Sequence, residues 1–480
     1  MRPLPAFIAA AMLIAAARTS AAAGDAPDDQ ATVMHALARH GLHDLEDERF
    51  NAYGQSTWIS SFKLPFSAAY TNANGSPNSL LTGFEHSWTW SLTLYAGVKL
   101  WPGAEVYFVP EVIAEQPLSG LKGLGGAIQN FELQKTGGTA PQIYRSRLYL
   151  QQTIGLGGKS VARESGPMQL GGRVDRRRLV FRVGNFSVID FFDKNSVTGD
   201  PRETFFNMAF MTYAAFDFVA DARGYSWGGM AELDWDDWAL RVGRLAPPTH
   251  PNVLPLTFEL DKYYGDQFEL SHDHKILGQP GAARLIAYRN VENMGRFDEA
   301  VAAFQADPSK NAAACTDYNY GSTNSNAPDL CWVRRPNVKV GIGLNVEQQL
   351  TKDIGVFFRG MYSDGRTEVY AFTSTDRSIS FGVLAKGSLW HRPRDVAGFG
   401  FGIGWISDAH AAYLRLGGID GFIGDGNINP AAESVFEALY SLNVWGGIWL
   451  SADYQHITNP AFNADRGPVD VFGVRAHVEF

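Results

Sequence analysis

Residues 87–100, SWTWSLTLYAGVKL, alternate between two kinds of side chain. The even-numbered phase is apolar and consists of Trp88, Trp90, Leu92, Leu94, Ala96, Val98 and Leu100. Most members of the other phase are small or polar. Successive side chains of a β-strand point to opposite faces, so this period of two predicts a strand with one apolar and one polar face. A strand of about ten residues is long enough to cross a bilayer at a tilt.

The same alternation recurs along the chain, as in AGFGFGIGW (residues 397–405) and VKVGIGLNVEQQL (residues 338–350). Sixteen strands are predicted, an even number as in bacterial single-chain barrels. Their ranges are 50–63, 86–101, 104–113, 143–156, 177–186, 223–233, 238–246, 263–274, 282–291, 337–350, 354–366, 377–390, 396–407, 433–445, 448–457 and 469–480. We therefore predict an all-β fold, a transmembrane antiparallel β-barrel.

The polar faces distinguish a membrane barrel from a soluble β protein. In an outer-membrane barrel the apolar face meets lipid and the polar face lines a wet lumen. Tryptophans lie near the ends of predicted strands, as an interfacial girdle requires: Trp88, Trp101, Trp235, Trp238, Trp390 and Trp445. Short turns alternate with long segments at 114–142, 187–222, 292–336 and 408–432, which we expect to be extracellular or folded into the lumen. A secreted soluble β protein that binds glycans is the alternative reading.

The N-terminal residues indicate export. Residues 1–23 begin with the basic Arg2, followed by an apolar run and small residues, which together predict a secretory signal peptide that is removed. Residues 24–49 are expected to form a partly helical periplasmic segment, and residues 50–480 the barrel. The net charge of −9 argues against a nucleic-acid partner. Cys315 and Cys331 bracket a polar loop and are expected to pair as a disulfide after export. No metal or cofactor is predicted.

Charged residues on the polar phase predict a channel lining. A charge that faces lipid near the midplane costs a few kcal/mol, so these side chains should point to water in the lumen. A polar lumen of mixed sign suits a channel for ions or small polar solutes. The residues assigned to it in this way are Arg145, Arg147, Arg241, Arg359, Lys386, Arg475, Glu111 and Glu269.

GYSWG (residues 224–228) matches the G-x-S-x-G pattern of serine hydrolases. A nucleophile elbow needs a strand–turn–helix context, whereas Ser226 lies within a predicted strand. We predict no enzyme activity, with a barrel hydrolase that uses Ser226 as the alternative.

Three further segments resemble a known family. RRRLVFRVGNFSVIDFFDKNSVTGDPRETFFNMAF (residues 176–210), ADARGYSWG (residues 220–228) and ITNPAFNADRGPVDVFG (residues 457–473) are similar to the OprB-type carbohydrate-selective porins of Gram-negative outer membranes. The resemblance implies facilitated diffusion of small, glucose-like sugars through a sixteen-stranded barrel. It also implies a constriction built from inward-folded loops, with arginine, acidic and aromatic side chains. Its best candidates here are Asp190, Asp193, Asn195, Asp200, Arg202 and Asn207.

The resemblance also implies the surroundings of the protein. We expect it in the outer membrane of a Gram-negative bacterium, in contact with lipid and lipopolysaccharide, with homo-oligomers possible. Residues 469–480, VDVFGVRAHVEF, should form the closing strand and pair with residues 50–63, because an unpaired edge is not tolerated in a membrane. Phe480 resembles the C-terminal aromatic signal that is read by the barrel-assembly machinery.

Overall fold

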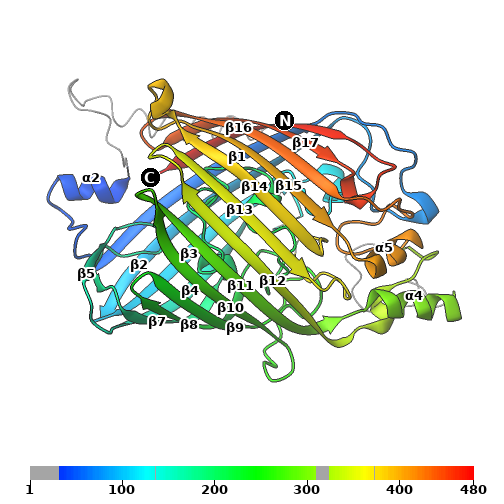
Figure 1. The fold of residues 1–480 in the computed structure, drawn as a ribbon, viewed down its shortest axis with the longest axis horizontal. Helices are drawn as coiled ribbons and strands as arrows, with labels where there is room; N and C mark the ends of the chain where they lie inside the picture. The colour runs from blue at the N-terminus through cyan, green and yellow to red at the C-terminus, as the bar shows by residue number, and fades with distance from the viewer. Residues whose placement is uncertain (1–31, 134, 136, 310–323, 372) are drawn as a thin grey trace.

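The protein is an antiparallel barrel of sixteen strands that closes on itself (Figure 1). A computed structural model describes residues 32–133, 135, 137–309, 324–371 and 373–480. Within these residues the barrel strands are β1 (Phe50–Lys63), β2 (Glu85–Trp101), β3 (Ala104–Gln116), β4 (Gln142–Gly155), β7 (Arg178–Phe186), β8 (Ser226–Trp235), β9 (Trp238–Leu245), β10 (Tyr264–Ile276), β11 (Gln279–Met294), β12 (Arg335–Gln349), β13 (Ile354–Ser363), β14 (Arg377–Lys386), β15 (Val396–Trp405), β16 (Glu433–Trp445), β17 (Ile448–Thr458) and β18 (Val469–Glu479). The predicted fold class is confirmed.

The barrel closes between its first and last strands. β1 and β18 are antiparallel, with Gln55 opposite Glu479 and Lys63 opposite Val471. The side chains of β18 point inward and outward as the alternation predicts. Phe472 and Val474 on the outer face are 46% and 49% exposed. Arg475 and His477 on the inner face are 2% and 1% exposed. The apolar phase faces outward, as in a membrane barrel, and the polar phase faces the interior.

The two ends of the barrel differ in the length of their connections. At one end, here called the short-turn end, two-residue turns join β2 to β3, β8 to β9, β10 to β11 and β16 to β17. The other end, here called the long-loop end, carries α4 (Phe297–Ala306) and α5 (Asp408–Arg415), on the right in Figure 1. The helix α2 (Val33–Arg39) lies at the short-turn end, and Met34 packs there against Tyr53 of β1. No helix among the described residues is long and apolar enough to cross a membrane.

Two long loops fill much of the barrel interior. The loop between β3 and β4 (117–141) and the loop between β7 and β8 (187–225) are here called the first and the second inward loop. Aromatic residues of the second loop pack against wall residues in one buried cluster, with Phe205 and Phe210 rings 4.9 Å apart. Each fully buried phenylalanine contributes about 1.5–3 kcal/mol, so the loop is held inside by a small core of its own.

The structure corrects the sequence analysis at two points. A register shift between Val109 and Pro110 in β3 places Ser146 as an extra residue in β4. The phase of β4 changes there, so Arg145 is exposed on the outer wall and its guanidinium lies 5.0 Å from the Trp227 ring, not in the lumen. Proline has no N–H for the ladder and is tolerated at such bulges.

The second correction is an additional hairpin. β5 (Ser160–Arg163) and β6 (Gly172–Asp175) form a separate two-stranded sheet within the β4–β7 connection. Its short, charged strands carry no clear alternation, which is why sequence reasoning missed them. The predicted signal peptide, residues 1–23, and Cys315 lie outside the described residues. The signal peptide and the pairing of Cys315 with Cys331 therefore stay predictions.

Candidate pore constriction

A carboxylate–guanidinium pair anchors the start of the second inward loop to the barrel wall. Asp190 ends the short 3-10 helix Val188–Asp190, and both of its carboxylate oxygens accept from Arg147 of β4 at 2.7 Å. Asp190 also accepts from the backbone N–H of Ser187. Burial would raise the pKa of Asp190, but the Arg147 guanidinium outweighs that effect and holds the pKa below its usual range. A bidentate pair of this kind fixes direction as well as position.

A second latch ties the loop to the opposite wall. Asp193 forms an ion pair with Arg359 of β13 at 3.1 Å and accepts from Thr212 and from Asn345 of β12. The Arg359 side chain also donates to Thr198 Oγ1 at 2.6 Å and to the Phe210 carbonyl at 2.9 Å. Arg359 therefore binds three separate parts of the same loop.

The far part of the loop is held through its backbone. Glu437 of β16 accepts from the N–H groups of Phe206 and Asn207, and Asn207 donates to Gln455 of β17. Arg475 of β18 donates to the carbonyls of Pro201 and Thr204. Backbone groups folded inside a barrel need partners, and these wall side chains supply them.

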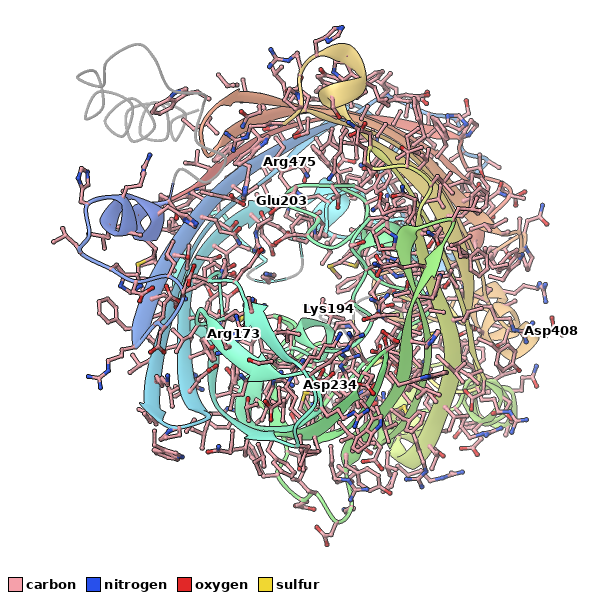
Figure 2. The ribbon with its side chains drawn as sticks, turned by 60° about the vertical axis from the view of Figure 1, so that its left-hand side comes forward. Arg173, Lys194, Glu203, Asp234, Asp408 and Arg475 are labelled. Atoms are coloured by element: carbon pink, nitrogen blue, oxygen red, sulfur yellow. The ribbon has the colours of Figure 1, made fainter. Side chains whose placement is uncertain are left out.

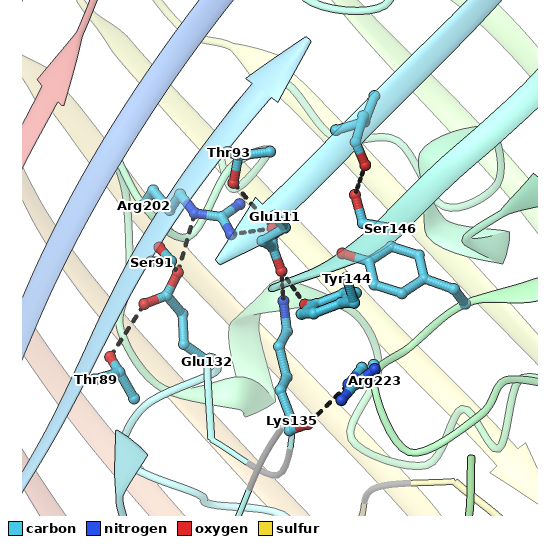
Figure 3. A network of polar contacts seen from close by, with 12 residues as sticks. Thr89, Ser91, Thr93, Glu111, Glu132, Lys135, Tyr144, Ser146, Arg202 and Arg223 are labelled. Atoms are coloured by element: carbon cyan, nitrogen blue, oxygen red, sulfur yellow. Dashed lines mark hydrogen bonds and ion pairs between the residues drawn. The ribbon is translucent and has the colours of Figure 1, made fainter. Parts of the chain in front are cut away.

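The first inward loop meets the second in a network of charges (Figure 3). Arg202 of the second loop lies between Glu132 of the first loop at 3.1 Å and Glu111 of β3 at 3.4 Å. Lys135 reaches the same Glu111 at 3.1 Å. The Glu132 carboxylate accepts in addition from hydroxyls of β2, Thr89 and Ser91. Every charge in this group is neutralised by another, which makes the group a rigid brace between both loops and the wall.

A further ion-pair chain runs along β8, β9 and β10. Arg241 joins Glu232 and Glu269, both at 2.7 Å, and Glu269 accepts from the Asp193 backbone N–H. These three ion-paired residues therefore hold the backbone of Asp193 in place and do not line the open part of the lumen.

The two loops leave a cavity of about 320 Å³ inside the barrel. Its charged lining residues are balanced in sign: Lys135, Arg147, Lys194, Arg202 and Arg223 against Asp190, Asp193, Asp200, Glu203 and Glu479. Aromatic rings line it as well: Tyr95, Phe131, Phe218 and Tyr225. Figure 2, seen from the short-turn side, places Lys194 and Glu203 inside the ring of strands.

Lys194 differs from the other cations of the cavity. Its side chain is exposed to the lumen, and among the described residues its ammonium has no ion-pair partner. Desolvation inside the barrel lowers the pKa of Lys194, against the opposing charge of Asp190. An unpaired ammonium at a narrow point can interact directly with a passing solute.

The predicted site residues fall into three groups. Arg147, Asp190, Asp193, Asn195, Asp200 and Arg202 line the cavity. Other predicted residues stand behind it as anchors of the loops: Asn207, Glu111, Arg241, Glu269, Arg359 and Arg475. Lys386 is exposed at the end of β14 at the short-turn rim, and Arg145 lies outside.

Several lining residues were missed by sequence reasoning. Lys135, Lys194, Glu203 and Arg223 lie in loops, where no alternation shows which way a side chain points. Met168 reaches the cavity from the β5–β6 hairpin, which narrows it from the short-turn end. The resemblance to the OprB-type porins pointed to the stretch from Asp190 to Asn207, and residues of this stretch line the cavity. Its role as the constriction stays a prediction.

Comparison with known proteins agrees with this architecture. The model of the OprB family, carbohydrate-selective porins, matches residues 78–480. The chain belongs to the OprB family of carbohydrate-selective porins. This protein is thus an outer-membrane sugar porin of a Gram-negative bacterium, as the resemblance implied. No curated protein gave a significant match.

One solved structure supports the fold, and others show a weaker similarity that carries no argument here. The high-pH structure of Pseudomonas putida OprB is similar with a TM-score of 0.67 at 15% identity, covering 96% of this chain and 100% of that one. The low-pH structure of the same protein has a TM-score of 0.49 at 13% identity, and the match covers 95% of this chain and 100% of that one. The outer membrane channel DcaP of Acinetobacter baumannii has a TM-score of 0.47 at 10% identity, and the match covers 90% of this chain and 97% of that one. The family and the fold indicate a channel rather than an enzyme.

Proposed function

We propose that the cavity between the two inward loops is the sugar-selective constriction, and that small glucose-like saccharides cross it by facilitated diffusion. The observation that supports this most is its mixed lining, in which carboxylates, guanidiniums and aromatic rings share one cavity of about 320 Å³. Sugar hydroxyls both donate and accept hydrogen bonds, so a sugar path needs acceptors and donors side by side. Small-molecule sites commonly have volumes of about 300–1,000 Å³.

Tyr225 is the best candidate for a stacking platform. It lines the cavity, and its ring lies 5.0 Å from the Arg147 guanidinium and 5.8 Å from the Lys135 ammonium. An aromatic face can cover the apolar side of a sugar while neighbouring cations bind its hydroxyls. Binding of this kind must stay weak enough for the solute to leave.

We further propose that transport involves no catalysis. The Ser226 hydroxyl of the G-x-S-x-G match is fully buried in β8 and donates to the Ala246 carbonyl. It is therefore directed at the backbone instead of at a general base, which disfavours the hydrolase alternative.

The orientation in the membrane is also a proposal. Long loops of bacterial barrels are extracellular and short turns periplasmic, so residues 32–49 with α2 are assigned to the periplasmic side. Residues 24–31 of the predicted periplasmic segment lie outside the described residues. Contact with lipopolysaccharide, recognition of Phe480 by the assembly machinery and homo-oligomerisation stay predictions.

Liposome swelling tests the sugar path. Wild-type protein should admit glucose faster than a polyethylene glycol of equal hydrodynamic radius. Tyr225→Leu should lower the glucose rate selectively, while the control Tyr362→Leu, on the outer wall of β13, should not. Equal rates for glucose and the polymer in the wild type would refute the selectivity.

A further inference from the structure

Three side chains of types that commonly bind metals meet at the short-turn end of the cavity. His477 and Glu479 are two residues apart in β18 and therefore share its inner face. Glu203 comes from the second inward loop. One ligand atom of each of these residues lies within 4.8 Å of the others. This group, here called the Glu203–His477–Glu479 cluster, takes no part in anchoring the loops as described above.

The histidine is oriented by a residue outside the cluster. His477 is 1% exposed, and its Nδ1 lies 2.8 Å from the Thr57 hydroxyl of β1. This contact turns Nε2 toward the carboxylates, where it lies 3.3 Å from Glu479 Oε1. Histidine ligands of metals are held in this manner, with the second ring nitrogen bonded to a fixed partner.

The cluster is accessible to an ion from solution. Glu203 and Glu479 both line the water-accessible cavity of the pore, while His477 forms the buried side of the cluster. Glu203 is exposed, so its carboxylate can move toward an ion. A metal site requires such an entry path in addition to its ligands.

We propose that the Glu203–His477–Glu479 cluster binds a divalent transition-metal cation of the Zn²⁺ type inside the pore. Imidazole with two carboxylates is a ligand set that suits Zn²⁺, and water can complete the coordination. Ligands at about 2.0–2.1 Å in a tetrahedron are roughly 3.3 Å apart, so the side chains need to close by only about 1.5 Å or less. The charge of Asp200 nearby favours a cation. Arg475 opposes it, but its guanidinium is directed at the carbonyls of Pro201 and Thr204.

Binding would change the pore in two ways. A metal shared by Glu203 and β18 would clamp the second inward loop to the wall at Glu203, an exposed residue of the loop. It would also place two positive charges beside the solute path. Cation current should fall and the ion selectivity should shift toward anions when the site is filled.

Direct binding of Zn²⁺ to the full-length folded barrel in detergent tests the site. We expect one Zn²⁺ per chain by isothermal titration calorimetry, and at least about a tenfold weaker affinity in Glu203→Gln. This variant should fold normally because Glu203 is exposed. Thr57→Val, which removes the positioning hydroxyl, should weaken binding by about 10–100-fold. The matched control Glu164→Gln removes an exposed carboxylate of the β5–β6 hairpin and should bind as the wild type does.

Two results would overturn the inference: a wild type that takes up no Zn²⁺, or equal binding by Glu203→Gln and Glu164→Gln. In planar bilayers, Zn²⁺ should shift the reversal potential of the wild type, with reversal by EDTA, and leave Glu203→Gln unchanged. Sugar entry measured in EDTA is independent of the metal, so a failure of the metal site and a failure of the sugar path are distinguishable.

Discussion

Replacing Arg359 tests whether the second inward loop shapes the pore. Arg359 is 1% exposed and holds Asp193, Thr198 and the Phe210 carbonyl at once. In Arg359→Met the Asp193 carboxylate stays buried and loses its cation, although Thr212 and Asn345 still donate to it. Breaking a buried ion pair from one side costs about 3–5 kcal/mol. At about 1.4 kcal/mol per factor of ten, the equilibrium for loop release moves by roughly two to three and a half orders of magnitude.

Single-channel recording in planar bilayers is the assay. The variant should show a larger mean conductance and more current noise than the wild type, because the loop leaves the pore part of the time. Limited proteolysis should cut within residues 187–225 more readily. Arg244→Met is the matched control: Arg244 pairs with Asp266 on the outer wall at 2.7 Å and is half exposed, so its loss should cost about 1 kcal/mol or less.

A second variant protects the test against misfolding. Asp193→Asn in the Arg359→Met background removes the uncompensated charge and should restore part of the stability, which a double-mutant cycle measures. If folded Arg359→Met, checked by its heat-modifiable migration, kept wild-type conductance and noise, the role of this latch in the constriction would be refuted.

Three further predictions concern other contacts. Burial alone would lower the pKa of His410 in α5, but Asp376 and Asp420, each 3.2 Å away, raise it from 6.5 to about 9. The stabilisation of the long loops by protonated His410 is therefore complete below pH 6.5 and is lost as the pH rises through 9. The loss amounts to on the order of 3 kcal/mol. Hydrogen exchange of α5 that stays constant from pH 7 to 10 would contradict this prediction. Lys194→Gln removes the unpaired ammonium of the cavity. It should raise the cation-to-anion permeability ratio about fivefold, which corresponds to ~1 kcal/mol. An unchanged reversal potential in a salt gradient would argue against a position of Lys194 beside the ion path. Glu433 accepts hydrogen bonds from the backbone N–H groups of Gly125, Gly126 and Ala127. Glu433→Gln should therefore lower the free energy that holds the first inward loop in place by about 1–3 kcal/mol, and proteolysis of the loop should be faster. Resistance to proteolysis equal to that of the wild type would count against this anchor.

The wall of the barrel was predictable because its physics is local. Alternation in residues 87–100 assigns each side chain of β2 to lipid or lumen without knowledge of any other strand. Arg145 shows the limit of that reasoning, since one extra residue opposite Pro110 reversed the phase. Pro110 itself was a visible signal for an interruption of the ladder.

The candidate constriction could be predicted only as a segment. The resemblance to the OprB-type porins pointed to the stretch after β7, but the contacts that hold this loop join residues far apart in sequence, since Arg359 and Asp193 are 166 positions apart. No periodic pattern carries such information. The lone Lys194 and the Glu203–His477–Glu479 cluster likewise arise from the way the loop folds back onto the wall.

The proposed constriction should prefer sugars over other neutral solutes of the same size. Ion current through single wild-type channels, measured while glucose is titrated on one side, tests it most directly. The current should fall and saturate with glucose, and a polyethylene glycol of equal hydrodynamic radius should lower it only as far as its viscosity requires. Equal, unsaturated reductions by both solutes would show that the pore has no binding site for glucose.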